Sequence, residues 1–176
     1  MKSSYEVRAQ KFIKIFAPYA IKCLMSRNII DIRNVVSKFN QLHHRSVKVY
    51  RGYTRIVFVT SDYVIKVDYR PDAHFGDSFR ELELYKCAAA DGYDYLFAKI
   101  TLFQYEHINF FIMPIVKGIN KNNGEAWNYM SVEERAWCMK YQLDDLHEMN
   151  FGINRNGDIT IFDYATCQIN YDEDCE

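Results

Sequence analysis

Residues 143–165 read LDDLHEMNFGINRNGDITIFDYA, and the interpretation of the whole chain depends on the polar residues in this stretch. Asp145 precedes Asn150 by five positions, and Asp163 follows after two short apolar runs. The turn residues at 155–158, RNGD, separate these runs, a pattern typical of a β-hairpin. The sequence therefore predicts a loop followed by a hairpin, with three oxygen-bearing side chains close together.

These three side chains have the chemistry that phosphoryl transfer requires. Mg²⁺ prefers oxygen ligands, which the Asn150 amide and the Asp163 carboxylate supply. A further carboxylate, here Asp145, would orient the attacking hydroxyl and accept its proton. Each residue alone also has an ordinary explanation: Asp145 as a charge on a helix surface, Asn150 as a helix C-cap and Asp163 as the end of a strand.

In this order the residues resemble the protein-kinase-like superfamily. Its catalytic loop has Asp, then Asn five residues later, then a hairpin that ends in Asp-Phe-Gly, where this chain has DYA at 163–165. The letters DLHEMN at 145–150 are closer to aminoglycoside-phosphotransferase-like kinases and small phage-encoded serine/threonine kinases than to eukaryotic protein kinases. The resemblance covers residues 47–166 and implies ATP and Mg²⁺ as cofactors, with the roles given above for the three side chains.

The segment YVIKVD at 63–68 resembles the kinase strand that carries the phosphate-binding lysine. The resemblance implies that Lys66 holds the nucleotide phosphates and pairs with a glutamate on the next helix. That helix offers Glu81 and Glu83, which face different sides, and we choose Glu81 with Glu83 as second choice. The ordinary alternative for Lys66 is a solvent-facing lysine on a strand.

Two further segments resemble parts of the nucleotide site of this superfamily. VYRGYTRIVFV takes the place of the glycine-rich phosphate loop but keeps only Gly52, so Arg51 or Arg55 is expected to supply side-chain donors to phosphate. FFIMPIV resembles the hinge, where backbone groups near Met113 and Ile115 would meet the adenine ring. Gly52, Arg55, Met113 and Ile115 complete the predicted nucleotide contacts.

The rest of the chain predicts an α+β protein. Apolar periodicity indicates helices at 5–25 and 31–42, and helix formers closed by a glycine indicate one at 76–92. A capping box of Ser131 and Glu134 begins a further helix that is expected to reach about His147. Clusters of β-branched and aromatic residues predict strands within the ranges 47–52, 55–62, 63–70, 96–106 and 108–116, and the last two are expected to form a hairpin through Glu106 and His107.

Together these elements predict a minimal protein-kinase-like fold. A five-stranded antiparallel sheet would pack on the helix near residues 77–91, followed by a reduced helical lobe and preceded by N-terminal helices that resemble nothing in the superfamily. We expect three parts: an N-terminal helical segment, a sheet with its helix, and a truncated lobe with the catalytic loop and the metal-binding hairpin. Their ranges are 1–45, 46–116 and 117–176.

Composition argues against several other classes of protein. A formal net charge of −1 offers no general attraction for nucleic acid, and no apolar run is long enough to cross a bilayer. The N-terminus lacks a secretory signal, so we expect a cytoplasmic protein, in the host cytoplasm if it is viral. The five cysteines have no metal-ligand or disulfide spacing and are interpreted as thiols, and His43 and His44 as surface residues.

The expected function is ATP- and Mg²⁺-dependent phosphotransfer, by a protein serine/threonine kinase of minimal size acting on a protein substrate or host protein. We expect the protein to lack the activation segment that follows this aspartate in the superfamily, and the phosphate loop is short of glycine. An alternative is therefore a catalytically weak or inactive kinase-like binding module, a pseudokinase that acts on a host or partner protein. A small-molecule kinase is the third possibility, and the sequence does not indicate an oligomeric state.

Overall fold

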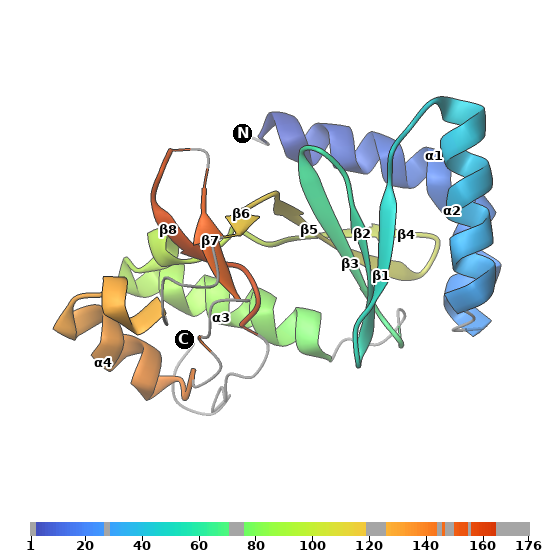
Figure 1. Ribbon diagram of the computed structural model, residues 1–176. Coiled ribbons are helices and arrows are strands. Elements are labelled where there is room, and N and C mark those ends of the chain that lie inside the picture. Colours follow the sequence, from blue (N-terminus) through green and yellow to red (C-terminus); the bar gives the residue numbers. More distant parts are fainter. Residues whose placement is uncertain are drawn as a thin grey trace. The chain divides into compact units, whose positions relative to one another are not determined.

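The computed structural model describes residues 3–26, 29–70, 76–118, 126–143, 146, 150–154 and 156–164. The chain forms two compact units (Figure 1). Unit 1 contains residues 1–78 and 100–115, and unit 2 contains residues 79–99 and 116–176. The N-terminal helical segment predicted for residues 1–45 thus belongs to the same unit as the sheet that follows it.

Unit 1 is built on a five-stranded antiparallel sheet with the strand order β1-β2-β3-β5-β4. Glu106 and His107 have positive φ values of 46° and 67°, which suits the tight turn of the predicted β4–β5 hairpin. The α+β class and the five-stranded antiparallel sheet are therefore confirmed. The strands are β1 (Lys48–Arg51), β2 (Arg55–Val59), β3 (Tyr63–Asp68), β4 (Thr101–Tyr105) and β5 (Ile108–Pro114).

Two N-terminal helices, α1 (Ser4–Ser26) and α2 (Ile29–His43), pack against this sheet. Helix α1 contacts β3, β4 and β5, while α2 contacts β1. Both predicted helices are confirmed, and they share one apolar core with the strands. The core of unit 1 thus lies between these two helices and one face of the sheet.

Alternation along the strands separates the two faces of the sheet. On β3, Ile65 and Val67 belong to the core shared with α1 and α2, so Lys66 between them points to the opposite face. Lys66 lies opposite Val57 on β2 and Phe111 on β5, which places it in the middle of the sheet. The opposite face also carries buried polar residues on three strands: Arg55, Asp68 and Asn109.

Unit 2 combines short helices with a three-stranded antiparallel sheet of order β6-β7-β8. The predicted hairpin is confirmed as β7 (Phe151–Ile153) and β8 (Ile159–Ile161). Strand β6 (Lys117–Gly118) was not predicted, because its two residues lie in a polar stretch without alternation. The helical elements are α3 (Asp77–Asp91), which begins in unit 1, η1 (Asp94–Leu96), η2 (Ala126–Tyr129) and α4 (Val132–Lys140).

Helix α4 begins as predicted and ends earlier. The Ser131 side chain accepts from the Glu134 amide at 3.2 Å and the Glu134 carboxylate accepts from the Ser131 amide at 2.5 Å, a complete capping box. The predicted extension to His147 is wrong, because Gln142 adopts a left-handed φ of 51° and its amide donates to the Met139 carbonyl. The helix therefore closes directly after Lys140.

The cysteines differ in state. Cys23 and Cys138 are free thiols, whereas Cys87 is disulfide-bonded. The expectation that all five are thiols is therefore wrong at Cys87. In the part of the chain that the structure describes, no helix is both long enough and apolar enough to cross a membrane.

Candidate functional site

The β7–β8 hairpin brings Asn150 and Asp163 together. Asn150 directly precedes β7 and Asp163 follows β8, with Phe151 paired to Ile161. The Asn150 carbonyl accepts hydrogen bonds from the amides of Phe162, at 2.8 Å, and Asp163, at 3.3 Å. Asn150 itself is only 8% exposed. The backbone on either side of the hairpin thus fixes the amide-bearing and the carboxylate-bearing residue as neighbours.

This pair fits the ligand chemistry of a hard divalent cation. The amide oxygen of Asn150 and the carboxylate of Asp163 are oxygen donors, and Mg²⁺ commonly uses one or two protein carboxylates together with phosphates and water. Among the residues described, no group of three or more His, Cys, Asp or Glu side chains could hold a metal ion. A cation at Asn150 and Asp163 would therefore take further ligands from elsewhere. Asp145 lies outside the described residues.

A buried glutamate lies next to this junction. Glu81, on α3, is 0% exposed, and its Oε1 accepts a long hydrogen bond of 3.4 Å from the amide of Tyr164, the residue after Asp163. The Tyr164 hydroxyl donates to the Ala98 carbonyl at 3.0 Å, which fixes this end of the hairpin segment in unit 2. Glu83 instead accepts from Lys86 at 2.7 Å near the surface. Only Glu81 of the two predicted glutamates is thus associated with the Asp163 segment.

Lys66 is a buried cation in unit 1. It is 5% exposed, so the alternative of a solvent-facing lysine is wrong. Removing an ammonium group from water is costly unless negative groups or ligands compensate. A buried lysine in the middle of the sheet therefore needs polar or negative partners around its ammonium group.

The β1–β2 turn is held together around Gly52. The Gly52 amide donates to the Arg55 carbonyl at 2.8 Å, and the Tyr69 hydroxyl donates to the Gly52 carbonyl at 3.0 Å. Arg51 donates through Nε to the Tyr69 hydroxyl, also at 3.0 Å. A Cβ at Gly52 would lie 3.2 Å from the Arg55 carbonyl oxygen, so the turn is tight at this position. Its single glycine is used to close the turn.

Arg55 belongs to a polar cluster at the start of α3 that sequence reasoning missed. Its guanidinium donates to the Ser78 hydroxyl at 3.4 Å, and this hydroxyl donates to Asp68 Oδ1 at 2.5 Å. The Ser78 amide donates to Asp68 Oδ2 at 3.2 Å, so a strand carboxylate caps the helix N-terminus. Gly76, with φ 141°, would place a Cβ 2.6 Å from Asp68 Oδ2. The Gly-Asp-Ser sequence at 76–78 was the available signal for this close approach.

The state of Asp68 predicts a pH effect on stability. Burial raises the pKa of the Asp68 carboxyl above its ordinary value, although hydrogen bonds from Ser78 and the charge of Arg55 act in the other direction. Between the unfolded and the raised folded pKa, the folded state binds more protons, so the free energy of unfolding contributed by Asp68 falls as pH rises through this window. Urea unfolding of wild type and Asp68→Asn across acidic to neutral pH should show the wild type losing stability relative to the variant. A stability difference between wild type and Asp68→Asn that does not change with pH would contradict a raised pKa of Asp68.

The two predicted hinge residues, Met113 and Ile115, make contacts within unit 1. Met113 is 1% exposed and pairs with Val64 on β3. The Ile115 amide donates to the Asp62 carbonyl at 3.1 Å. This donor therefore already has a partner in the protein, and the contribution of Ile115 to a ligand would have to come from its other groups.

No model of a known protein family matches the chain, and no curated protein matches it significantly. Neither finding assigns a family.

Proposed function

We propose that the chain binds ATP with Mg²⁺ and transfers the terminal phosphoryl group to a hydroxyl, in the first place that of Ser or Thr on a protein. In this proposal Asn150 and Asp163 hold the metal, and Lys66 holds the nucleotide phosphates. Glu81 orients Lys66, and Asp145 is the catalytic base. These are the roles that the resemblance to protein-kinase-like enzymes implies.

The observation that carries the proposal is the junction between Asn150 and Asp163. Two amides donate to the Asn150 carbonyl, so the residue that ends the predicted catalytic loop lies beside the residue that ends the hairpin. These hydrogen bonds hold the backbone of the two residues side by side, so less backbone freedom would be lost if their side-chain oxygens bound a cation.

The buried charges Lys66 and Glu81 give further support. A lysine that is 5% exposed and a glutamate that is 0% exposed would each be costly without a compensating role. The Tyr164 amide connects Glu81 to the segment that contains Asp163. A nucleotide would add to the partners of Lys66, since phosphate oxygens form strong charge-assisted hydrogen bonds with an ammonium group.

The protein's own residues would act mainly by positioning and charge. Asp145 would accept the proton of the attacking hydroxyl as its oxygen bonds to phosphorus, and the bond to the leaving diphosphate breaks. Lys66 would stabilise the negative charge on the phosphates through donated hydrogen bonds. Bound Mg²⁺ would supply neutralisation of charge on the phosphate oxygens.

A nucleotide-binding module without efficient transfer is the second candidate, and three observations favour it. Gly52 is the only glycine in the β1–β2 turn. Arg55, expected to compensate for the missing glycines, donates to Ser78. The Ile115 amide, expected near the adenine ring, donates to Asp62. Phosphate and base contacts would then be fewer than in an efficient enzyme.

The test is incubation of the full chain with γ-labelled ATP and Mg²⁺, with host-cell extract as acceptor and nucleotide affinity measured in parallel. Lys66→Met should weaken nucleotide binding roughly 10- to 100-fold, because a hydrogen bond to a charged group contributes about 1.5–3 kcal/mol. Lys48→Met is the matched control, since Lys48 is an exposed lysine on β1.

The outcomes separate the candidates. Label on protein supports the serine/threonine kinase, label on small molecules the metabolite kinase, and nucleotide binding without transfer the binding module. Absence of nucleotide binding, or equal effects of Lys66→Met and Lys48→Met, would contradict the site assignment.

A further inference from the structure

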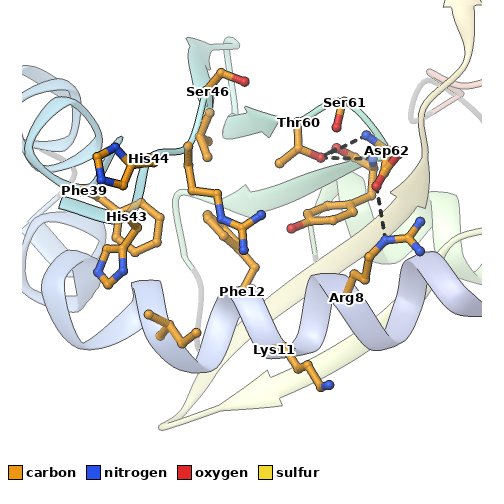
Figure 2. A pocket seen from close by; sticks show the side chains of 14 residues that line it. Arg8, Lys11, Phe12, Phe39, His43, His44, Ser46, Thr60, Ser61 and Asp62 are labelled. Atoms are coloured by element: carbon orange, nitrogen blue, oxygen red, sulfur yellow. Dashed lines mark hydrogen bonds and ion pairs between the residues drawn. The ribbon is translucent and has the colours of Figure 1, made fainter. Parts of the chain in front are cut away.

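A pocket of 420 Å³ lies within unit 1. It is formed by α1, by the end of α2 with the loop after it, and by the β2–β3 turn (Figure 2). The lining residues fall in three stretches of the chain, 8–15, 39–47 and 60–63. The pocket therefore exists only because the N-terminal helices pack against the sheet.

The lining is cationic. Its basic residues are Arg8, Lys11, His43, His44 and Arg45. Asp62 is the only carboxylate among the 14 residues that line it. With the histidines neutral, three positive charges and one negative charge leave the lining at +2. An excess of fixed positive charge in a concave site attracts anions.

Only one of the permanent cations is neutralised. Arg8 Nε lies 3.1 Å from Asp62 Oδ2, and Figure 2 shows this ion pair reaching from α1 to the turn. Neither Lys11 nor Arg45 has an ion-pair partner within the part of the chain that is described. The pocket thus contains cations that an incoming anion can engage without breaking an existing pair.

The loop that carries Arg45 is fixed by Asn40. The Asn40 side chain donates to the Val47 carbonyl at 2.8 Å and accepts from the Val47 amide at 3.0 Å, and the Asn40 carbonyl accepts from the Arg45 amide at 3.1 Å. His44, with φ 48°, turns the chain out of α2. Arg45 is thereby presented from a well-defined backbone, which lowers the entropy lost when a ligand binds.

Tyr63 shows that the charges converge. Burial raises the pKa of its hydroxyl, the charges of Arg45 and Arg8 lower it, and the charge of Asp62 raises it. Three charged groups from α1, from the loop after α2 and from the turn therefore act on the same buried hydroxyl. Arg8 and Arg45 also line the same pocket as Tyr63.

We propose that this pocket binds a phosphomonoester group. Arginine presents a planar array of donors that matches phosphate oxygens, and the serine hydroxyls of the lining, Ser46 and Ser61, add donors. The apolar side chains of Phe12 and Ile15 offer a surface for the body that carries the phosphate. This body can be a free phosphorylated metabolite or a phosphorylated side chain of a partner protein.

The proposal is independent of the nucleotide site. Tyr63 belongs to the core face of β3, whereas Lys66 points to the opposite face of the same strand. The two sites therefore lie on different faces of the sheet in unit 1. Loss of one is not expected to remove the other.

Isothermal titration calorimetry on the full chain tests the pocket with three probes: inorganic phosphate, free O-phosphoserine and a short phosphoserine peptide. Saturable binding of phosphate is expected. Tighter binding of the peptide than of free phosphoserine would support a phosphorylated partner as the source, and equal affinities would support a free metabolite. Failure of all three probes to bind would overturn the proposal.

Three variants check that binding occurs in the pocket. Arg45→Gln should weaken phosphoserine binding at least tenfold, the effect of about 1.5 kcal/mol for a lost charged hydrogen bond. Lys14→Gln removes the same charge from an exposed position of α1 outside the pocket and should leave affinity unchanged. Asp62→Asn should tighten binding, a gain that partial unfolding cannot produce. Equal weakening by Arg45→Gln and Lys14→Gln, or weaker binding in Asp62→Asn, would overturn the proposal.

Discussion

Asp163→Asn is expected to lose both Mg²⁺-dependent nucleotide binding and phosphoryl transfer, whereas Asp145→Asn is expected to lose transfer alone. Asp163 would be the charged member of the metal-binding pair, so its replacement by a neutral amide removes the attraction for the cation. Asp145 would act only on the acceptor hydroxyl, and the loss of a general base typically lowers the rate about 10²- to 10⁴-fold. Nucleotide titration with and without Mg²⁺, beside the labelled-ATP assay, measures the two effects separately.

The matched control is Asp158→Asn in the same hairpin. Asp158 is exposed, and its carboxylate accepts a 3.3 Å hydrogen bond from the Asn154 side chain at the turn. This variant has the same chemistry and charge change and should keep both activities. Equal losses in Asp163→Asn and Asp158→Asn would show that the hairpin fold, rather than a metal ligand, had been tested.

Phe16→Ala is expected to destabilise the protein by about 3–5 kcal/mol, the usual cost of removing a buried aromatic side chain. Phe16 is 1% exposed, and its ring centroid lies 5.1 Å from that of Phe12, 5.2 Å from that of Phe39 and 5.1 Å from that of Phe58. These contacts join α1, α2 and β2. The loss of stability should therefore extend to the sheet.

Chemical denaturation followed by circular dichroism measures this change. Val7→Ala on the same helix is the control, because Val7 is 41% exposed and its truncation should cost far less. A difference of less than about 1 kcal/mol between the two variants would mean that the aromatic cluster contributes little. It would also remove the argument that α1 is an integral part of unit 1.

Features determined by neighbouring residues were predicted well. The capping box at Ser131 and Glu134, the turn at Glu106 and His107 and the alternation in the strands are local signals, and each is found in the structure. The early end of α4 was missed because the left-handed residue that follows the helix is Gln142, whereas the usual sequence signal for this conformation is a glycine.

In the candidate site, too, contacts between residues close in the sequence were predictable and contacts between distant residues were not. Asn150 and Asp163 are adjacent because a short hairpin connects them, which the sequence predicts directly. The bond from Arg55 to Ser78 and the bond from Ile115 to Asp62 join residues far apart in the chain. Local sequence patterns do not predict contacts of this kind. For the same reason the cationic pocket, assembled from three separate stretches, could not be predicted, and His43 and His44 were interpreted only as surface residues.

The packing of α1 and α2 against the sheet also limits how the sequence of this chain can evolve. Apolar residues of three strands, among them Phe58, Ile65 and Phe110, are covered by these helices. A lineage that discarded the helices would leave an extended apolar surface in contact with water, a state that favours self-association. Viable descendants would have to replace residues on all three strands with polar ones at nearly the same time. The N-terminal helices are therefore difficult to lose by gradual substitution.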